Sequence, residues 1–180
     1  MNIIGNSCAS SYVVRDFIKQ QHTTPFVWCS CSEADIIYVI DNYDSINWNN
    51  FHTELYENKT FHIKNVRVIV DNKVIIKYPH YCLSTGKLKI DGINVFSIDI
   101  IKWVSDKYEE RVSRMQSAGA PFYIIGGTWE DQYISLSTKY RYGNNNNVFI
   151  LNNYDIIHDN YKVANINYAD IQEKLKLLQH

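Results

Sequence analysis

The sequence has no excess of positive charge, because 18 Lys and Arg residues stand against 19 Asp and Glu residues. Proteins that bind nucleic acid by neutralising phosphates normally carry a basic excess or a basic stripe. We therefore expect no nucleic-acid partner. Glycine and proline are also scarce, with 7 and 3 residues, which excludes collagen-like and linker-like chains. No apolar run reaches the roughly 18 residues that a membrane-spanning helix needs, so we expect no membrane span.

Cysteine is sparse too, with 4 residues in the chain. The first residues lack the basic region and long apolar stretch of a signal peptide. We therefore expect a cytoplasmic protein with four reduced thiols. The Cys29-Ser30-Cys31 element has no second spaced pair of the kind that completes a zinc site. We expect neither a metal nor a cofactor.

What the sequence does have is apolar material: 46% of its residues are hydrophobic and 14% are aromatic. Its length fits a single domain over residues 1–180. Short apolar runs at 2–5, 122–125 and 148–151 predict buried central strands of one sheet. The runs at 66–70 and 74–78, separated by Asp71-Asn72-Lys73, predict a β-hairpin. Helical patterns lie at 9–20, from a cap at Ser30 through Ile40, at 48–57, from a cap at Ser97 through Met115, and at 168–178.

Interleaved strands and helices predict an α/β fold. The expected architecture is a single layered domain with a mainly parallel central sheet, flanked by helices and extended by the hairpin. In such sheets ligands collect at the carboxyl ends of the strands.

The first candidate site lies at such an end, where Gly5, Asn6, Ser7 and Cys8 join the first strand to the first helix. A Cys at a helix start is stabilised as the thiolate by the helix dipole and by unpaired backbone N–H groups. The same N–H groups can hold an oxyanion. This pattern predicts a nucleophilic Cys8 with a lowered pKa, in a binding turn formed by Gly5, Asn6 and Ser7. The alternative is that Cys8 is a small buried core residue.

Two elements offer a base. His80 follows the second hairpin strand and can reach a distant nucleophile, since such groups are assembled in space. Asp155 and His158 lie three residues apart after the last strand, where the carboxylate can orient the imidazole. With Ser7 as the nucleophile, this late pair fits an esterase that opens with Gly-Asp-Ser. Asn6 replaces the Asp of that opening.

Several stretches together resemble one bacterial family of unknown function, described as papain-like cysteine peptidases and associated with surface-polysaccharide synthesis. The matching stretches are Ile4-Gly5-Asn6-Ser7-Cys8 with Val14-Arg15, Pro25-Phe26-Val27-Trp28, Tyr78-Pro79-His80-Tyr81, and Tyr108-Glu109-Glu110-Arg111 through Phe122-Tyr123-Ile124-Ile125. The likeness covers roughly the first 125 residues. Val27 and Tyr81 stand where the family has acidic residues.

This resemblance implies a cysteine hydrolase or acyltransferase in which Cys8 is the nucleophile. It favours His80 over His158 as the base and places Trp28 at the site. The expected substrate is a small molecule, a glycan or an acyl group. Two alternatives remain open: the Ser7 esterase with Asp155 and His158, and a non-catalytic binding module related to glycans.

Overall fold

The computed structural model describes residues 2–13, 15, 24–26, 28–59, 63–84, 87–90, 93–95, 99–128, 147–152, 156–157 and 162–163. Within them, β1 (Asn2–Gly5), β7 (Pro121–Thr128) and β8 (Val148–Asn152) form a parallel sheet in the order β1-β7-β8. Ile4 is opposite Tyr123, and Ile124 is opposite Phe149. The prediction that these three apolar runs belong to one sheet is confirmed.

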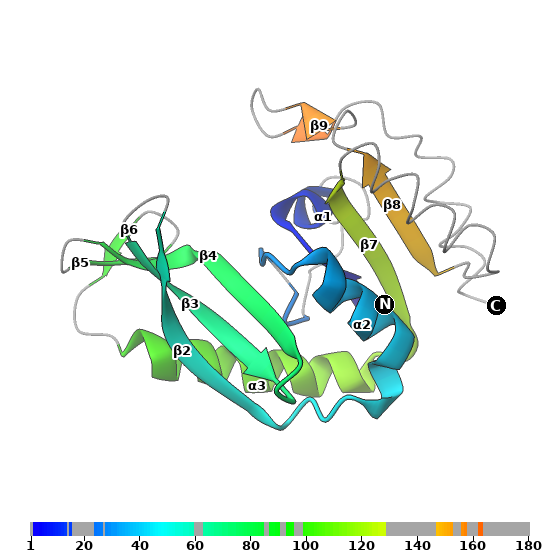
Figure 1. Cartoon of the computed structure of the whole chain (residues 1–180), viewed down its shortest axis with the longest axis horizontal. Helices are drawn as coiled ribbons and strands as arrows, with labels where there is room; N and C mark the ends of the chain where they lie inside the picture. The colour runs from blue at the N-terminus through cyan, green and yellow to red at the C-terminus, as the bar shows by residue number, and fades with distance from the viewer. Residues whose placement is uncertain are drawn as a thin grey trace.

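A second sheet is larger and entirely antiparallel (Figure 1). It contains β2 (Phe51–Asn58), β3 (Ile63–Val70), β4 (Val74–Ser84), β5 (Lys87–Ile90) and β6 (Ile93–Val95), in that order. The predicted hairpin is confirmed as β3 and β4. Its turn has positive φ at Asp71 and Asn72, 51° and 54°, and Lys73 N–H donates to Val70 O, which is the backbone of a primed hairpin turn.

The predicted combination of helices, a parallel sheet and an antiparallel hairpin is therefore present among the described residues, and the hairpin belongs to a five-stranded sheet that is larger than the three-stranded parallel one. The predicted helix at 48–57 is wrong, since Phe51–Asn58 is strand β2. Phe51 and Leu55 are four residues apart, and that spacing fits one face of a helix as well as one face of a strand. The two short strands at 87–95 had no distinct sequence signal.

Among the described residues, helices α1 (Cys8–Val13), α2 (Glu33–Asn42) and α3 (Ile100–Ser117) pack against these sheets. The cap of α2 is Ser32, whose Oγ accepts from Asp35 N, rather than Ser30. The cap of α3 is Asp99, whose carboxylate accepts from Ile101 N and Lys102 N, rather than Ser97. A 3-10 turn (Tyr43–Ser45) follows α2, and β9 (Ile156–Ile157) pairs with β10 (Lys162–Val163). The predicted helix at 168–178 and residues 16–20 lie outside the described residues.

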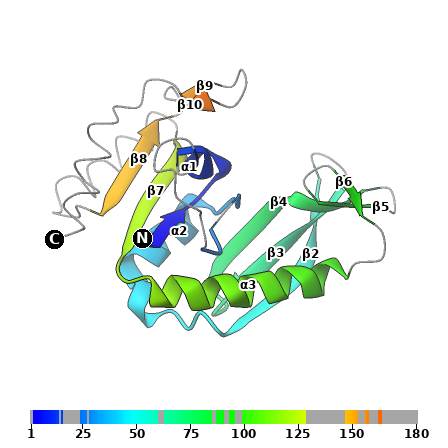
Figure 2. The ribbon, with the colours of Figure 1, turned by 180° about the vertical axis from the view of Figure 1, so that it is seen from behind.

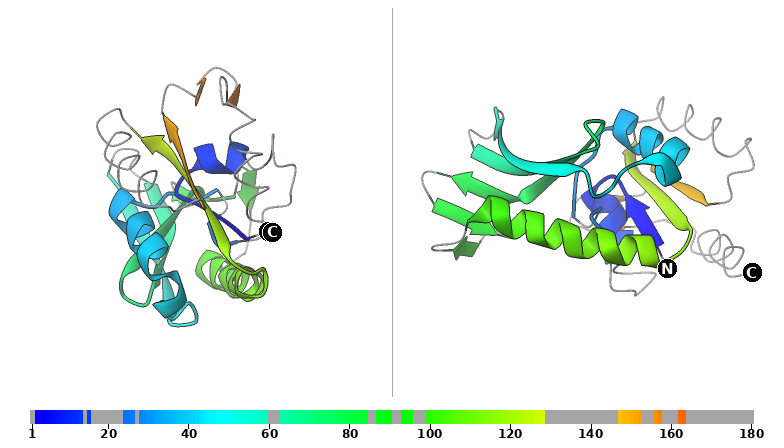
Figure 3. Two further views of the ribbon diagram at one scale, coloured as in Figure 1. Left: turned by 90° about the vertical axis from the view of Figure 1, so that its right-hand side faces the viewer. Right: turned by 90° about the horizontal axis from the view of Figure 1, so that it is seen from below.

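Helix α3 runs along one face of the antiparallel sheet and contacts β2 and β3 (Figure 2). Seen from below, the helix continues from that sheet toward the start of β1 (Figure 3). Its buried side is the predicted stripe, which includes Val104, Tyr108, Val112 and Met115. The apolar spacing of α3 was therefore predicted correctly.

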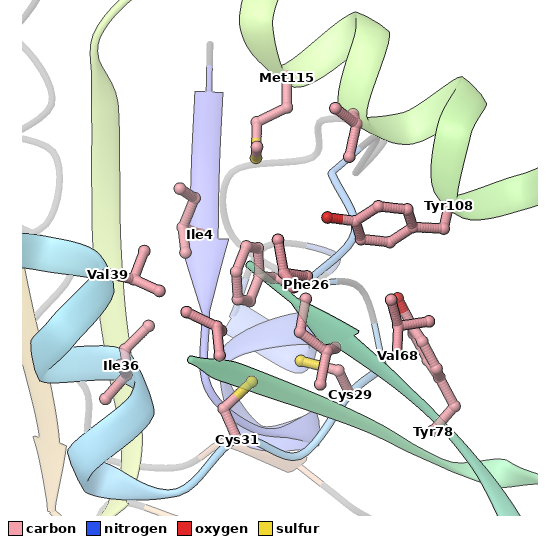
Figure 4. Packing of buried hydrophobic residues seen from close by; sticks show 14 of the residues in the cluster. Ile4, Phe26, Cys29, Cys31, Ile36, Val39, Val68, Tyr78, Tyr108 and Met115 are labelled. Carbon is pink, nitrogen blue, oxygen red and sulfur yellow. The ribbon is translucent and has the colours of Figure 1, made fainter. Parts of the chain in front are cut away.

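One hydrophobic core joins the two sheets (Figure 4). It contains Ile4 of β1, Val68 of β3 and Tyr108 of α3. Phe26 lies among them, fully buried, with its ring edge-on to Trp48 at 6.0 Å between centroids. The position of one sheet relative to the other is thus set by packing on a shared core.

Candidate active site

Cys8 is the first residue of α1 and is separated from the carboxyl end of β1 by Asn6 and Ser7, at the junction that the sequence predicted. The turn between them is tight. A Cβ on Gly5 would overlap with the Ser10 side chain, and Ser10 Oγ donates to Ser7 O at 2.5 Å. Gly5 therefore acts through its small size, which lets the first turn of α1 fold back on β1.

Asn6 anchors this turn to both neighbouring elements. Its side-chain Oδ1 accepts from Gly126 N of β7 at 2.7 Å, and its backbone oxygen accepts from Cys31 N at 2.8 Å. Asn6 is 8% exposed. In the structure Asn6 has an architectural role, since these two hydrogen bonds fix the turn before Cys8.

The segment that contains Trp28, Cys29, Ser30 and Cys31 bridges the two sheets. The backbone N–H of Cys31 donates to the backbone oxygen of Asn6. In the same segment Ser30 N donates to Lys77 O at 2.8 Å, and Lys77 N donates to Ser30 O at 3.0 Å. These bonds tie the end of β1 to β4. They hold the strand that carries His80 against the turn that carries Cys8.

His80 lies in a bulge of β4. Val66 pairs with Tyr78 and the preceding Asn65 pairs with Cys82, so that Pro79, His80 and Tyr81 are extra residues on β4. A bulge bends its strand and redirects side chains, and bulges are common beside active sites. Proline is also excluded from a regular inner ladder but tolerated at a bulge. The bulge therefore explains both the Pro in this strand and the direction of His80.

Cys8 and His80 meet across the two sheets. The distance from Cys8 Sγ to His80 Nε2 is 3.4 Å, within hydrogen-bond reach for a thiol and an imidazole. Cys8 is half-buried and His80 is exposed. The pair thus lies at the surface, where a substrate can reach it.

Trp28 completes the site on the side of His80. The two rings are edge-on, with 6.1 Å between centroids and an interplanar angle of 83°. Trp28 has a positive φ of 50°, and its N–H donates to Ser11 Oγ at 2.9 Å. Bulky residues rarely adopt this conformation, and such strained residues cluster at functional sites. The sequence prediction placed Trp28 at the site, and the structure puts it beside His80.

The prediction that Cys8 has a lowered pKa is corrected by the structure. Burial raises the pKa of Cys8 from 9.0 to about 11, the nearby Cys29 adds to this, and a hydrogen bond to the Cys8 backbone opposes it. Loss of hydration is the largest of these influences and outweighs the backbone hydrogen bond. At neutral pH the neutral thiol is then by far the more populated form. Cys8 therefore rests as a thiol and needs a base to become a nucleophile.

The other candidates named from the sequence do not add a described group to this pair. Ser7 Oγ is buried and has no hydrogen-bond partner among the described residues. Asp155 and His158 lie outside the described residues. Cys29 and Cys31 are free thiols buried in the core. No group of three or more His, Cys, Asp or Glu side chains able to hold a metal occurs in the part of the chain that the structure describes.

Sequence reasoning missed the β4 bulge and the residue opposite it, Asn65. The available signal was Pro79 inside a β-branched run, which points to an edge strand or a bulge.

Comparison of the chain with protein-family models, with curated protein sequences and with solved structures finds no match. None of the described helices is long and apolar enough to cross a membrane.

Several thiol and phenol groups that are shielded from water predict a loss of stability at high pH. The pKa of Cys31 is raised by a hydrogen bond with Cys29 and by burial, and burial raises the pKa of Tyr78 and Tyr108 as it does that of Cys8. All four groups hold their protons more tightly in the folded state. Their contribution to the free energy of unfolding is then fully present below pH 9 and is lost as pH rises through 11 and beyond. Each group that ionises only on unfolding adds about 1.4 kcal/mol per pH unit to the decline.

The urea midpoint, followed by far-UV circular dichroism from pH 8 upward, measures this loss. Replacement of Cys8 by Ser removes one of the four groups and should make the decline between pH 9 and 11 shallower. A midpoint that is constant over this range would contradict the prediction.

Proposed function

We propose that the protein is a cysteine hydrolase or acyltransferase, with Cys8 as the nucleophile and His80 as the general base. The observation that carries the proposal is the 3.4 Å approach of Cys8 Sγ to His80 Nε2. Two side chains that are 72 positions apart in the chain meet here, and a strand bulge directs one of them. General bases act from about 2.6–3.2 Å, and catalytic hydrogen bonds are often longer in a structure without substrate.

The raised pKa of Cys8 defines the order of events in this proposal. As Cys8 Sγ attacks an acyl carbon, its proton moves to His80 Nε2. The carbonyl π electrons move to the oxygen and then return to expel the alcohol or amine, which takes the proton from His80. The resulting thioester is cleaved by water or by an acceptor alcohol, and His80 removes the proton of that second nucleophile. The thiol is restored at the end.

The contact between Cys8 and His80 supports Cys8 as the nucleophile, whereas Asp155 and His158, which a Ser7 esterase would use, lie outside the described residues. Ser7 Oγ has no hydrogen-bond partner among the described residues, whereas Cys8 Sγ has an imidazole within 3.4 Å. The resemblance noted above makes glycans and acyl groups of surface-polysaccharide precursors the first substrates to test, in a cytoplasmic setting that keeps thiols reduced.

We also propose that the chain forms one layered α/β domain, which the core shared by both sheets supports.

An activated ester tests the proposal without knowledge of the substrate. On incubation with p-nitrophenyl acetate, the wild-type protein should release a burst of nitrophenolate and carry an acetyl group on Cys8, read by peptide mass spectrometry after an acid quench. Replacement of Cys8 by Ala should abolish both signals. Replacement of Ser7 by Ala should leave both in place. An acetyl group on Ser7, or no adduct at all, would overturn the proposal.

A further inference from the structure

The β4 bulge needs a partner for the backbone groups that it removes from the ladder. Between Tyr78 and Cys82 the strand has three residues with no opposite number on β3. Buried carbonyl groups without partners cost free energy comparable to a lost hydrogen bond. Something must therefore bind the carbonyls of the bulge if it is to keep one conformation.

Asn65 supplies these bonds from the facing strand. Its Nδ2 donates to Pro79 O at 3.0 Å and to Tyr81 O at 3.4 Å. These are the carbonyls of the residues immediately before and after His80. The amide has two hydrogens, one for each carbonyl, so a single side chain binds the backbone on both sides of the histidine.

Asn65 is itself held in place. It is 1% exposed, and its Oδ1 accepts from Asn58 Nδ2 of β2 at 3.3 Å. A fixed amide on a central strand is a more rigid support than a loop. The shape of the bulge, and with it the direction of the His80 ring, is set from β3.

We infer that Asn65 is a positioning residue, which clamps the Pro79 and Tyr81 carbonyls and so holds His80 Nε2 at Cys8 Sγ. The kinetic part of this inference rests on the proposed role of His80 as the base. Asn65 touches neither reacting atom. Its effect must pass through His80, and that requirement makes the inference testable.

The test is a double-mutant cycle on the alkylation of Cys8 by iodoacetamide at pH 7, followed by peptide mass spectrometry so that the four cysteines are read separately. Asn65→Asp keeps the size of the side chain but has no donor when ionised. We expect it to slow Cys8 alkylation by at least about tenfold, because small displacements of a catalytic group can cost up to roughly 100-fold. In a His80→Ala background the same change should have no further effect.

Asn2→Asp is the matched control for a buried asparagine. Asn2 is fully buried, and its Nδ2 donates to Met115 O and Gly119 O at 3.0 Å, at the opposite end of β1 from Cys8. It should lower the urea midpoint without slowing Cys8 alkylation. If Asn65→Asp does not fold, Asn65→Ala removes the same two bonds without adding a charge.

Ring ¹⁵N and ¹³C shifts of His80, assigned with His80→Ala, separate the two hypotheses. We expect Asn65→Asp to move the His80 signals and Asn2→Asp to leave them in place. Unmoved His80 signals, or a slowing by Asn65→Asp that persists in the His80→Ala background, would overturn the inference about Asn65. If His80→Ala alone does not slow alkylation while Asn65→Asp still moves the His80 signals, the proposed base is wrong and the positioning role stands.

Discussion

Replacement of His80 by Ala is expected to slow the alkylation of Cys8 at neutral pH by about 100-fold, the lower end of what general bases contribute. The reason is the raised pKa of Cys8, about 11. With so little thiolate at pH 7, the rate depends on a group that accepts the thiol proton as the new bond forms. His80 is that group, since its Nε2 is 3.4 Å from the sulfur.

The measurement is the rate of iodoacetamide incorporation at each cysteine, from pH 6 to 11. In the wild type, Cys8 should react faster than Cys29 and Cys31, which are 0% and 8% exposed. In His80→Ala, the rate at Cys8 should fall at neutral pH and approach that of the wild type near pH 11, where the thiolate forms unaided. His52→Ala is the matched control, because His52 is an exposed histidine on β2 beside Glu54. Equal rates in wild type and His80→Ala would show that the pair is not coupled.

Replacement of Phe26 by Ala is expected to lower the free energy of unfolding by about 3–5 kcal/mol, as for other large-to-small changes in a protein core. The ring is fully buried at the junction of the two sheets (Figure 4). The backbone around it is pinned as well: Thr24 Oγ1 donates to Ile3 O at 2.9 Å, and Tyr78 OH donates to Pro25 O at 2.7 Å. The surroundings therefore have little freedom to collapse into the space left by the ring.

Urea unfolding followed by tryptophan fluorescence measures this effect, since Trp48 packs edge-on against Phe26. Phe26→Leu keeps most of the volume and should cost about 1–2 kcal/mol. Tyr43→Phe serves as a conservative control, because it removes only the hydroxyl that accepts from Asn2 Nδ2. A cost for Phe26→Ala below that of Phe26→Leu would show that the two sheets do not depend on this contact.

The sequence was informative where local pattern and tertiary packing agree. The short apolar runs of β1, β7 and β8 indicated buried strands. The apolar residues on the buried side of α3 repeat at helical spacing over its whole length. The sequence was misleading at β2, where the four-residue spacing of Phe51 and Leu55 fits the period of a helix and the period of a strand. The sequence also identified Cys8 and His80 separately. The prediction that His80 follows the second hairpin strand was wrong, however, because β4 continues through the bulge to Ser84.

The meeting of Cys8 and His80 could not be predicted from the residues alone. It depends on the bonds of Cys31 to Asn6 and of Ser30 to Lys77, which are backbone contacts that any side chain would allow. The clamp by Asn65 was equally hidden, because a buried asparagine in a strand has no local signature. The ionisation of Cys8 was predicted with the wrong sign, since the extent of burial outweighs the position at a helix start.

The order of strands in the parallel sheet has a consequence for how the protein is made. The antiparallel sheet joins consecutive strands between residues 51 and 95, whereas β1 pairs with β7, and Ile3 meets Phe122. Local pairings close early and distant ones close late. During synthesis, the strand that precedes Cys8 is made more than a hundred residues before its neighbour in the sheet exists. The thiol is thus translated well before the sheet beside it is assembled.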